Sequence, residues 1–460
     1  MARPPAEHGV TQRGRVRRVA GLAARVGASY GRSLLARSLG LSDADAAALT
    51  HERNAARVLE TAVALRGPFM KLVQLFGMQN EMLPEPYLDA LSTLHDKAPP
   101  LPWRDIRSVL AAEFGREPEE VFCSIDPEPI AAASLGQVYA GTLPDGTAVA
   151  IKVQYPGVRD AVETDLRTFR RLIRAQKRLG ADLLRVSGLD YEDMFADLAD
   201  RLREELDYRR EAANIDLFRR IYEGWEWVTI PRVYREFSTD RVLTMDRLHG
   251  KPFGAALRAS MPYPDRERLV FRLSEMLDHE YYGVGIFHAD PHPGNKLIAP
   301  DGRIEVVDFG CIKILPRGTR DGFRTSAAAL LRGDDDANLA ALRDLGIYRD
   351  GLDPSPLLAW SRFCNLPLLV DAPYDGRGHA YPNELFDRLA DLTRHGYLHF
   401  APHTFFLLRT FVGLVAIFRL LDVTTINQHQ RTKAFFANRL GEGEHIRQQL
   451  EREHLIDDVD

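Results

Sequence analysis

Three polar residues stand close together in one stretch of the chain, which reads HADPHPGNKLIAPDGRIEVVDFG from His288 to Gly310. Asp290 and Asn295 are spaced as D-x-x-x-x-N, and Asp308 opens a D-F-G triplet after the apolar run RIEVV. Phosphoryl transfer requires a carboxylate near the acceptor, together with oxygen ligands that hold Mg²⁺ on the nucleotide phosphates. Asp, Asn, Gly and Pro are also common turn residues. The order of the two motifs around an apolar strand nevertheless indicates a kinase catalytic loop followed by its metal-binding triplet.

A kinase also needs a lysine on a strand and a glutamate on a helix that pairs with it. The segment AVAIK ends at Lys152, in the second strand of a hairpin predicted by GQVYAGTLPDGTAVAIKVQYPG. Glu211, within EELDYRREAANIDLF, is the best candidate for its partner. On a continuous helix Glu211 would share a face with Asp207, four residues earlier. Such a run alone is typical of a solvated charged helix, and Lys152 and Asp308 are what favour a functional interpretation.

The glycine-rich phosphate loop of an ordinary protein kinase is missing from the sequence. PIAAASLGQVYAG stands in its place, with the phosphate-facing positions Ala131, Ala132, Ala133, Ser134 and Gly136. Because alanine disfavours positive φ, this loop should be stiffer and approach phosphate differently. Met245, in VLTMDRLHG, stands where a kinase hinge would hold the adenine.

The composition bounds the class of protein. The chain has 460 residues, 45% hydrophobic and 27% charged, with a net charge of −5, which suits two or three packed units and gives no general attraction to nucleic acid. Three scattered cysteines without a C-x-x-C pair indicate no zinc or redox motif. No secretory signal is visible, so a cytoplasmic protein is expected. The apolar segment Thr404–Leu421 contains two arginines and predicts a buried helix rather than a transmembrane span.

The pattern along the chain divides it into five parts. These are a basic N-terminal arm (1–43), a helical extension (44–100), an N-lobe with inserted helices at 159–180 and 190–223 (101–248), a C-lobe (249–440) and a charged, solvent-exposed C-terminal helix or tail (441–460). Residues 13–37 contain arginines and no acidic residue. Two interpretations of the arm stay open: an amphipathic segment at the membrane periphery, in contact with anionic lipid, or a solvated helix or disordered arm.

Taken together, AAASLGQV, VAIKVQYPGV, EELDYRREAAN, HADPHPGN and DFG resemble the UbiB/AarF family of atypical kinases over roughly residues 60–425. The resemblance implies an α+β, bilobal protein-kinase-like fold with an N-terminal helical extension packed over the active site. It implies ATP hydrolysis with Mg²⁺ in support of isoprenoid quinone (ubiquinone-like) biosynthesis or lipid homeostasis. The implied partners are ATP and a quinone-precursor lipid or quinone-biosynthesis proteins.

The resemblance also implies roles for individual residues. Asp290 would be the catalytic-loop aspartate, and Asn295 and Asp308 would hold the metal. Lys152 would contact the nucleotide phosphates and form an ion pair with Glu211, while the alanine-rich loop would cover the nucleotide. The regulatory extension and the family's E-x-D element would comprise Lys71, Gln74, Glu205 and Asp207.

Two departures from the family pattern stand out. Val73 occupies the glycine position of the family's K-x-G-Q signature, and its β-branched side chain should push a packed partner away. Lys296 follows Asn295 where an apolar residue is more usual, which should alter the packing of the loop. We interpret His288 as an organiser of the loop backbone, His292 as a loop residue without an assigned role, and Cys311 as a core residue.

Two alternative functions remain. The first is a true phosphotransferase acting on a protein or a small molecule, which the missing glycine-rich loop and the K-x-x-Q extension argue against. The second is a non-catalytic scaffold that binds nucleotide or lipid. A scaffold has no chemical need for the whole polar set, namely Lys152, Glu211, Asp290, Asn295 and Asp308.

Overall fold

The computed structural model describes residues 12–38, 44–65, 69, 100–132, 135–179, 191–290, 292–348, 350–373, 388, 392, 397 and 404–456. Lys71, Val73 and Gln74 of the expected extension, and Ala133 and Ser134 of the alanine-rich loop, lie outside these residues. Within them the chain forms two compact units. Unit 1 extends to Arg209 and includes Tyr234–Arg247, and unit 2 comprises Arg210–Val233 and the chain from Leu248 onward.

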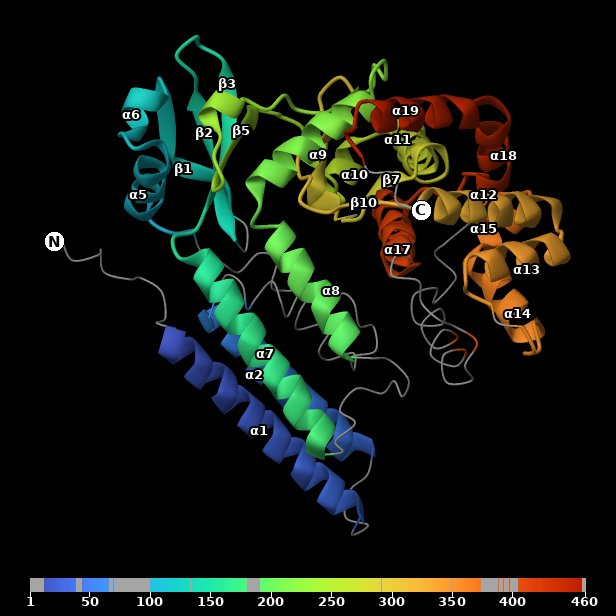
Figure 1. Cartoon of the computed structure of the whole chain (residues 1–460), viewed down its shortest axis with the longest axis horizontal. Coiled ribbons are helices and arrows are strands. Elements are labelled where there is room, and N and C mark those ends of the chain that lie inside the picture. The colour runs from blue at the N-terminus through green and yellow to red at the C-terminus, as the bar shows by residue number, and fades with distance from the viewer. Residues whose placement is uncertain are drawn as a thin grey trace. The chain divides into compact units, whose positions relative to one another are not determined.

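The elements follow one another in the colour order of Figure 1. Unit 1 contains α1 (Gln12–Ser38), α2 (Ala44–Leu65), α5 (Trp103–Phe114), α6 (Pro118–Val121), β1 (Ser124–Ala132), β2 (Gly136–Thr142), β3 (Ala148–Gln154), α7 (Val158–Leu179), α8 (Tyr191–Glu204), η1 (Arg235–Phe237) and β5 (Val242–Asp246). Helix α9 (Tyr208–Ile221) begins in unit 1 and ends in unit 2. Unit 2 continues with β4 (Val228–Thr229), β6 (Lys251–Pro252), α10 (Ala255–Ser260), α11 (Tyr263–Asp278), the π-helical turn η2 (His279–Val284), β7 (Ile286–His288), η3 (Pro293–Asn295), β8 (Lys296–Ile298), β9 (Ile304–Val306), β10 (Ile312–Ile314), α12 (Arg317–Arg332), α13 (Asp335–Asp344), α14 (Ser355–Cys364), α15 (Leu366–Leu369), α17 (Thr404–Leu421), α18 (Gln428–Asn438) and α19 (Leu440–Arg452).

Unit 1 is built on an antiparallel sheet of order β1-β2-β3-β5. The predicted hairpin is confirmed as β2 and β3, which pair from Gly136 with Gln154 to Thr142 with Ala148. Because side chains alternate along a strand, Val149, Ile151 and Val153 share one face, where they are buried against α5. Figure 1 shows α5 and α6 beside this sheet.

Helices α1, α2 and α7 of unit 1 run side by side (Figure 1). The buried face of α1 contains Val19, Leu22 and Arg15. Arg15 donates to both carboxylate oxygens of the buried Asp165 on α7, and to the carbonyl of Leu65 at 2.8 Å. For residues 12–38 the disordered-arm interpretation is therefore wrong, because this basic segment is a packed amphipathic helix. The helical pattern expected over 190–223 divides into α8 and α9, with a turn at residues 205–207.

Unit 2 contains a four-stranded sheet of order β4-β9-β8-β6 and the antiparallel pair β7 and β10. Apolar residues from η2, β7, α12 and α18 form a buried core that also contains Cys311, as predicted. In α17 Ile417 and Leu421 are buried and Leu420 is exposed. None of the helices among the described residues combines the length and the hydropathy that a bilayer crossing needs.

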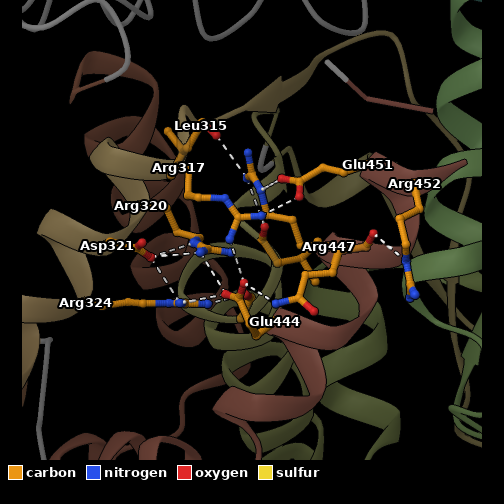
Figure 2. Close-up of polar contacts among 12 residues, drawn as sticks. Leu315, Arg317, Arg320, Asp321, Arg324, Glu444, Arg447, Glu451 and Arg452 are labelled. Carbon is orange, nitrogen blue, oxygen red and sulfur yellow. Dashed lines mark hydrogen bonds and ion pairs between the residues drawn. The ribbon is translucent and has the colours of Figure 1, made fainter. Parts of the chain in front are cut away.

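The C-terminal segment differs from the expected solvent-exposed helix or tail. In α19 the residues Gly443, Arg447 and Leu450 are buried, and the charged side chains pair with arginines of α12 (Figure 2). The charged local sequence predicts solvent exposure. The arginines that pair with Glu444 lie more than a hundred residues earlier in the chain, so the local pattern does not reveal them.

Candidate functional site

Lys152 and Met245 lie on the same face of the unit 1 sheet. Lys152 pairs with Leu243, and Met245 pairs with Ala150, two residues before Lys152 on β3. Cross-strand partners and i,i+2 neighbours project to one side of a sheet, so this face lies opposite the core packed on α5. Lys152 is half-buried there. The predicted strand position of the lysine is confirmed.

The turn between α8 and α9 is held against the end of β3. Gln154 donates from Nε2 to the carbonyl of Leu206 at 2.7 Å, and Arg159 donates to the same carbonyl at 3.1 Å. The ring of Tyr208, the first residue of α9, lies under the ammonium of Lys152, 5.2 Å from Nζ to the ring centroid. This turn contains Glu205 and Asp207, so the E-x-D element lies within unit 1 beside the β3 lysine. Asp207 precedes α9, and the expected helical i,i+4 relation to Glu211 was wrong.

The described part of the alanine-rich segment is a strand rather than a loop. Ala131 and Ala132 end β1, are exposed, and pair with Val138 and Gln137 of β2. Neither has a positive φ. Gly136 has a steric role, because a Cβ there would lie 2.4 Å from the carbonyl oxygen of Val153. The close approach of β2 to β3 therefore requires glycine at this position.

His288 organises the backbone of the D-x-x-x-x-N loop (His288–Asn295) in unit 2. Its Nδ1 accepts from the backbone amide of Asp290 at 3.2 Å, and its Nε2 lies 2.5 Å from the carbonyl oxygen of Asp308. These two contacts require the neutral tautomer with hydrogen on Nε2. Burial lowers the pKa of His288, and the charge of Lys296 lowers it further, both of which favour that neutral form. The predicted role of His288 is confirmed.

The loop brings the side chains of Asp290 and Asn295 together. Asn295 donates from Nδ2 to the Asp290 carboxylate at 3.2 Å and to its carbonyl at 3.3 Å. The backbone of Asn295 also accepts from Val307, next to Asp308, at 3.1 Å. His292, which had no assigned role, accepts at Nδ1 from Gly294 at 3.0 Å and so caps the short turn η3.

The D-F-G triplet is fixed from α9 by residues of unit 2. The backbone amide of Phe309 lies 3.4 Å from Oε1 of Glu211, and Asn214 donates to the carbonyl of Phe309 at 2.9 Å. The buried Phe309 ring packs edge-on against Phe218, with centroids 5.4 Å apart. Asp308 accepts the amide of Gly310 at 2.9 Å. The helical position of Glu211 is confirmed, and its carboxylate is nearly fully buried.

Two further charged groups lie near the loop. Glu280, in the π-helical turn, accepts the backbone amide of His288 at 2.8 Å and the hydroxyl of Tyr222. The residue Lys296 is half-buried, and burial lowers the pKa of its ammonium group. The negative charges of Glu280 and Asp290 act in the opposite direction and raise it. Lys296 is therefore electrostatically coupled to the loop.

The oxygen atoms of this cluster suit a hard divalent cation. The amide nitrogen of Asn295 faces Asp290, so its Oδ1 is the atom that could bind a metal, and the Asp308 carboxylate could supply a second oxygen ligand. Among the residues that the structure describes, no group of three or more His, Cys, Asp or Glu side chains is placed to bind a metal. A metal held by Asn295 and Asp308 would thus need further oxygen ligands, such as those of a nucleotide.

The structure brings together Asp290, Asn295, Asp308 and Glu211 in unit 2, and Lys152, Met245 and Gly136 in unit 1. Since Lys152 and Glu211 belong to different units, their ion pair stays a prediction. Lys71 and Gln74 lie outside the described residues, as do Ala133 and Ser134.

A family model described as "ABC1 atypical kinase-like domain" matches residues 93–341. The chain belongs to this family. Its fold is accordingly a kinase-like α+β fold, in agreement with the resemblance to AarF-type proteins found in the sequence. The match includes every candidate site residue except Lys71 and Gln74.

Relatives of this ABC1 chain include kinases by name. It is 34% identical to "Protein ACTIVITY OF BC1 COMPLEX KINASE 8, chloroplastic" of Arabidopsis thaliana, over 64% of this chain and 38% of that protein. It is 32% identical to "AarF domain-containing protein kinase 1" of Mus musculus, over 58% of this chain and 50% of that protein. The first curated relatives are therefore much longer than the part that this chain matches.

A solved structure of Rv3197 in complex with erythromycin, from Mycobacterium tuberculosis, is similar over 85% of this chain and 98% of that chain. The TM-score is 0.60 and the sequence identity is 26%.

Sequence reasoning missed two residues of the site. Tyr208 follows the E-x-D element directly, and that adjacency was a usable signal. Glu280 lies in the stretch LDHEYYGVGIFH, where a buried acidic residue next to aromatic residues indicates a hydrogen-bonding position.

Proposed function

We propose that this ABC1 chain binds ATP with Mg²⁺ and hydrolyses it, and that it supports isoprenoid quinone biosynthesis or lipid homeostasis. The observation that carries the proposal is the set of hydrogen bonds by which His288 links Asp290 to Asp308. Asp290 thereby lies within one hydrogen-bonded cluster with the two metal-ligand candidates, Asn295 and Asp308. Phosphoryl transfer uses a carboxylate close to oxygen ligands for Mg²⁺, and the proximity of these three residues supports the proposal.

Each residue has a definite task in this proposal. Asp290 orients the attacking water and accepts its proton, while Asn295 restrains the Asp290 carboxylate through the bond from Nδ2. Lys152 binds the nucleotide phosphates, and Tyr208 limits where its ammonium can lie. When bound between Asn295 and Asp308, Mg²⁺ would neutralise phosphate charge. Glu211 holds the D-F-G backbone through Phe309, and in this proposal it also forms the ion pair with Lys152 that the family resemblance implies.

Hydrolysis is favoured over transfer to a protein because the exposed β1 alanines replace a flexible glycine-rich loop. The extension with Lys71 and Gln74 would cover the site, as the family resemblance implies. The lipid partner is supported by α1, whose outward face exposes arginines for contact with an anionic membrane periphery: Arg17, Arg18, Arg25 and Arg32.

The deciding experiment compares the full chain with its Asp290→Asn variant. Phosphate release from ATP is measured with Mg²⁺ and with EDTA, without lipid and with vesicles of neutral or anionic phospholipid. Turnover should require Mg²⁺ and fall about 100-fold or more in Asp290→Asn, while ATP binding persists. Equal phosphate release by the wild type and Asp290→Asn would reject hydrolysis at this site. ATP binding without any phosphate release would leave the scaffold function. Radiolabel on an added protein or small molecule would support a phosphotransferase.

A second candidate function is macrolide binding. It is favoured by the similarity to the Rv3197 chain, which was solved with erythromycin and is matched over 98% of its length. A calorimetric titration of the full chain with erythromycin, with and without ATP, tests this candidate. Absence of heat at millimolar antibiotic would dismiss it.

A further inference from the structure

The backbone carbonyls that end the helix before the D-x-x-x-x-N loop are bound by arginines from distant helices. Helix α11 continues into the π-helical turn η2, and Gly285 terminates it with a φ of +76°. Arg324 of α12 donates to the carbonyls of Tyr282 and Gly283, and Arg447 of α19 donates to that of Val284 at 3.2 Å. The last carbonyls of a helix have no partner within it and lie at its negative end, so guanidinium groups stabilise them.

Arg447 also joins the two strands that support the loop. Its Nη1 lies 3.0 Å from the carbonyl oxygen of Leu315, which directly follows β10, as well as reaching Val284 just before β7. The amide of Leu315 in turn donates to the carbonyl of Gly285 at 2.8 Å. The fully buried guanidinium of Arg447 therefore links the two strands at the end of the β7–β10 pair that lies away from His288.

The arginines are held in place by carboxylates of α19 (Figure 2). Glu444 lies 2.8 Å from Arg317, 2.8 Å from Arg320 and 3.1 Å from Arg324. Burial opposes ionisation of Glu444, but these three cations lower its pKa to about 2, so it stays charged near neutral pH. Glu451 accepts Nε of Arg447 at 2.8 Å and also pairs with Arg317.

The backbone of helix α19 packs directly against the backbone of the π-helical turn. A Cβ on Gly443 would lie 2.4 Å from Cα of Gly283, and a Cβ on Gly285 would lie 2.9 Å from Nη1 of Arg447. The fit leaves no room for a side chain at either glycine. The position of the turn is therefore set by α19, which lies outside the segment 93–341 matched by the family model.

The same turn holds the loop directly. Glu280, within η2, accepts the amide of His288, which is two residues before Asp290 and bonds to Asp308. We propose that α19, acting through Arg447, is a positioning element for Asp290 and Asp308, because it fixes the π-helical turn from which Glu280 and β7 extend. This inference rests on the proposed ATP hydrolysis for its kinetic readout, although its structural readout does not.

The test compares Arg447→Met with Leu450→Ala in the full chain. Leu450 is a buried residue of the same helix whose apolar side chain cannot donate a hydrogen bond to these carbonyls, so its variant reports simple loosening of α19. Phosphate release, ATP affinity, thermal midpoint and amide hydrogen exchange are measured for each protein. Arg447→Met should lower turnover about tenfold with ATP affinity unchanged within about twofold, and speed exchange in residues 286–295 about threefold or more. Leu450→Ala should speed exchange in α19 alone.

Further variants keep the proposal open to refutation. Arg447→Lys should recover part of the turnover, because an ammonium can still donate to one carbonyl. If Arg447→Met does not fold, Glu451→Gln should show the same pattern more weakly, since it removes the carboxylate charge that holds Arg447 and leaves the guanidinium in place. Loss of turnover that merely follows the thermal midpoint in both main variants would overturn the positioning role. If the wild-type protein releases no phosphate, the proposed function fails, and unchanged exchange in 286–295 would then overturn this inference separately.

Discussion

Nε2 of His288 lies 2.5 Å from the carbonyl oxygen of Asp308, across twenty residues of sequence. The contact is made to the main chain, so it fixes where the D-F-G triplet begins without involving the carboxylate of Asp308. Because Nδ1 of the same ring binds the amide of Asp290, one neutral imidazole sets the spacing of both candidate aspartates.

Asp308→Asn should separate chemistry from folding. The amide keeps an oxygen that can accept the hydrogen bond from Gly310, and the carbonyl bond to His288 is untouched. We expect Mg²⁺-dependent ATP turnover to fall by about 100-fold or more, with little change in the thermal midpoint. Asp301→Asn, in the exposed turn after β8, is the matched control and should behave as wild type. Unchanged activity in Asp308→Asn would remove its assignment to the metal.

Ala132→Gly tests whether the stiff segment before β2 contacts the nucleotide. The glycine gains the positive-φ conformations that alanine disfavours, so ATP and ADP affinities should change by about threefold or more. Isothermal titration measures both. Ala148→Gly is the same change at another exposed position of this sheet, and it should leave both affinities alone. Identical binding by all three proteins would contradict the role assigned to this segment.

Gly136→Ala should destabilise unit 1. The new methyl group would lie 2.4 Å from the carbonyl oxygen of Val153 and 3.0 Å from the hydroxyl of Tyr208, so β2 and β3 must separate. We expect a loss of about 1–3 kcal/mol in the free energy of unfolding, measured with urea. Gly27→Ala, on helix α1 with no atom near the new Cβ, should instead be neutral or slightly stabilising. Equal stability of the two variants would refute the close approach.

His279 should make the folded state sensitive to mild acid. Burial lowers its pKa from 6.5 to about 4, with Arg439 acting in the same direction and Glu442 and the Ile221 carbonyl opposing. Above pH 6.5 the imidazole is neutral in both folded and unfolded chains. Between pH 6.5 and 4 only the unfolded chain takes up the proton, so the free energy of unfolding should fall, by roughly 2 kcal/mol at pH 5.

The measurement for His279 is urea unfolding of the wild type and His279→Gln at pH 7 and pH 5. Other groups also titrate in this range, and His288 acts in the same direction because its pKa is lowered too. The variant should therefore lose less stability than the wild type between the two pH values. If both proteins lost the same free energy of unfolding between pH 7 and pH 5, His279 would have to be protonated in the folded protein at pH 5.

The sequence was most informative where chemistry and local geometry coincide. The hairpin with Lys152, the helix with Glu211 and the backbone role of His288 all follow from short motifs whose residues lie near one another. Local periodicity could not reveal the turn at residues 205–207, because charged residues continue through it without proline or glycine.

Long-range charge pairing was hidden for a related reason. Arg15 and Arg447 belong to segments whose composition predicts solvent exposure, yet both are buried. Their acceptors, Asp165 for one and the Val284 and Leu315 carbonyls for the other, lie far away in the chain. A single sequence does not show which distant carboxylate or carbonyl binds a given arginine, so the segment of α19 was predicted as a solvent-exposed helix or tail.

The π-helical turn at His279–Val284 also determines which residues of α11 and of the turn itself face the same side. An α-helix advances by about 100° per residue, and a π turn absorbs one additional residue without lengthening the helix by a full turn. Deleting one residue there would restore regular winding but rotate Glu280 away from the amide of His288. Homologous chains can thus be aligned through this region only if that extra residue is counted, because a shift of one residue would turn every assigned position of α11 by about 100° around the helix axis.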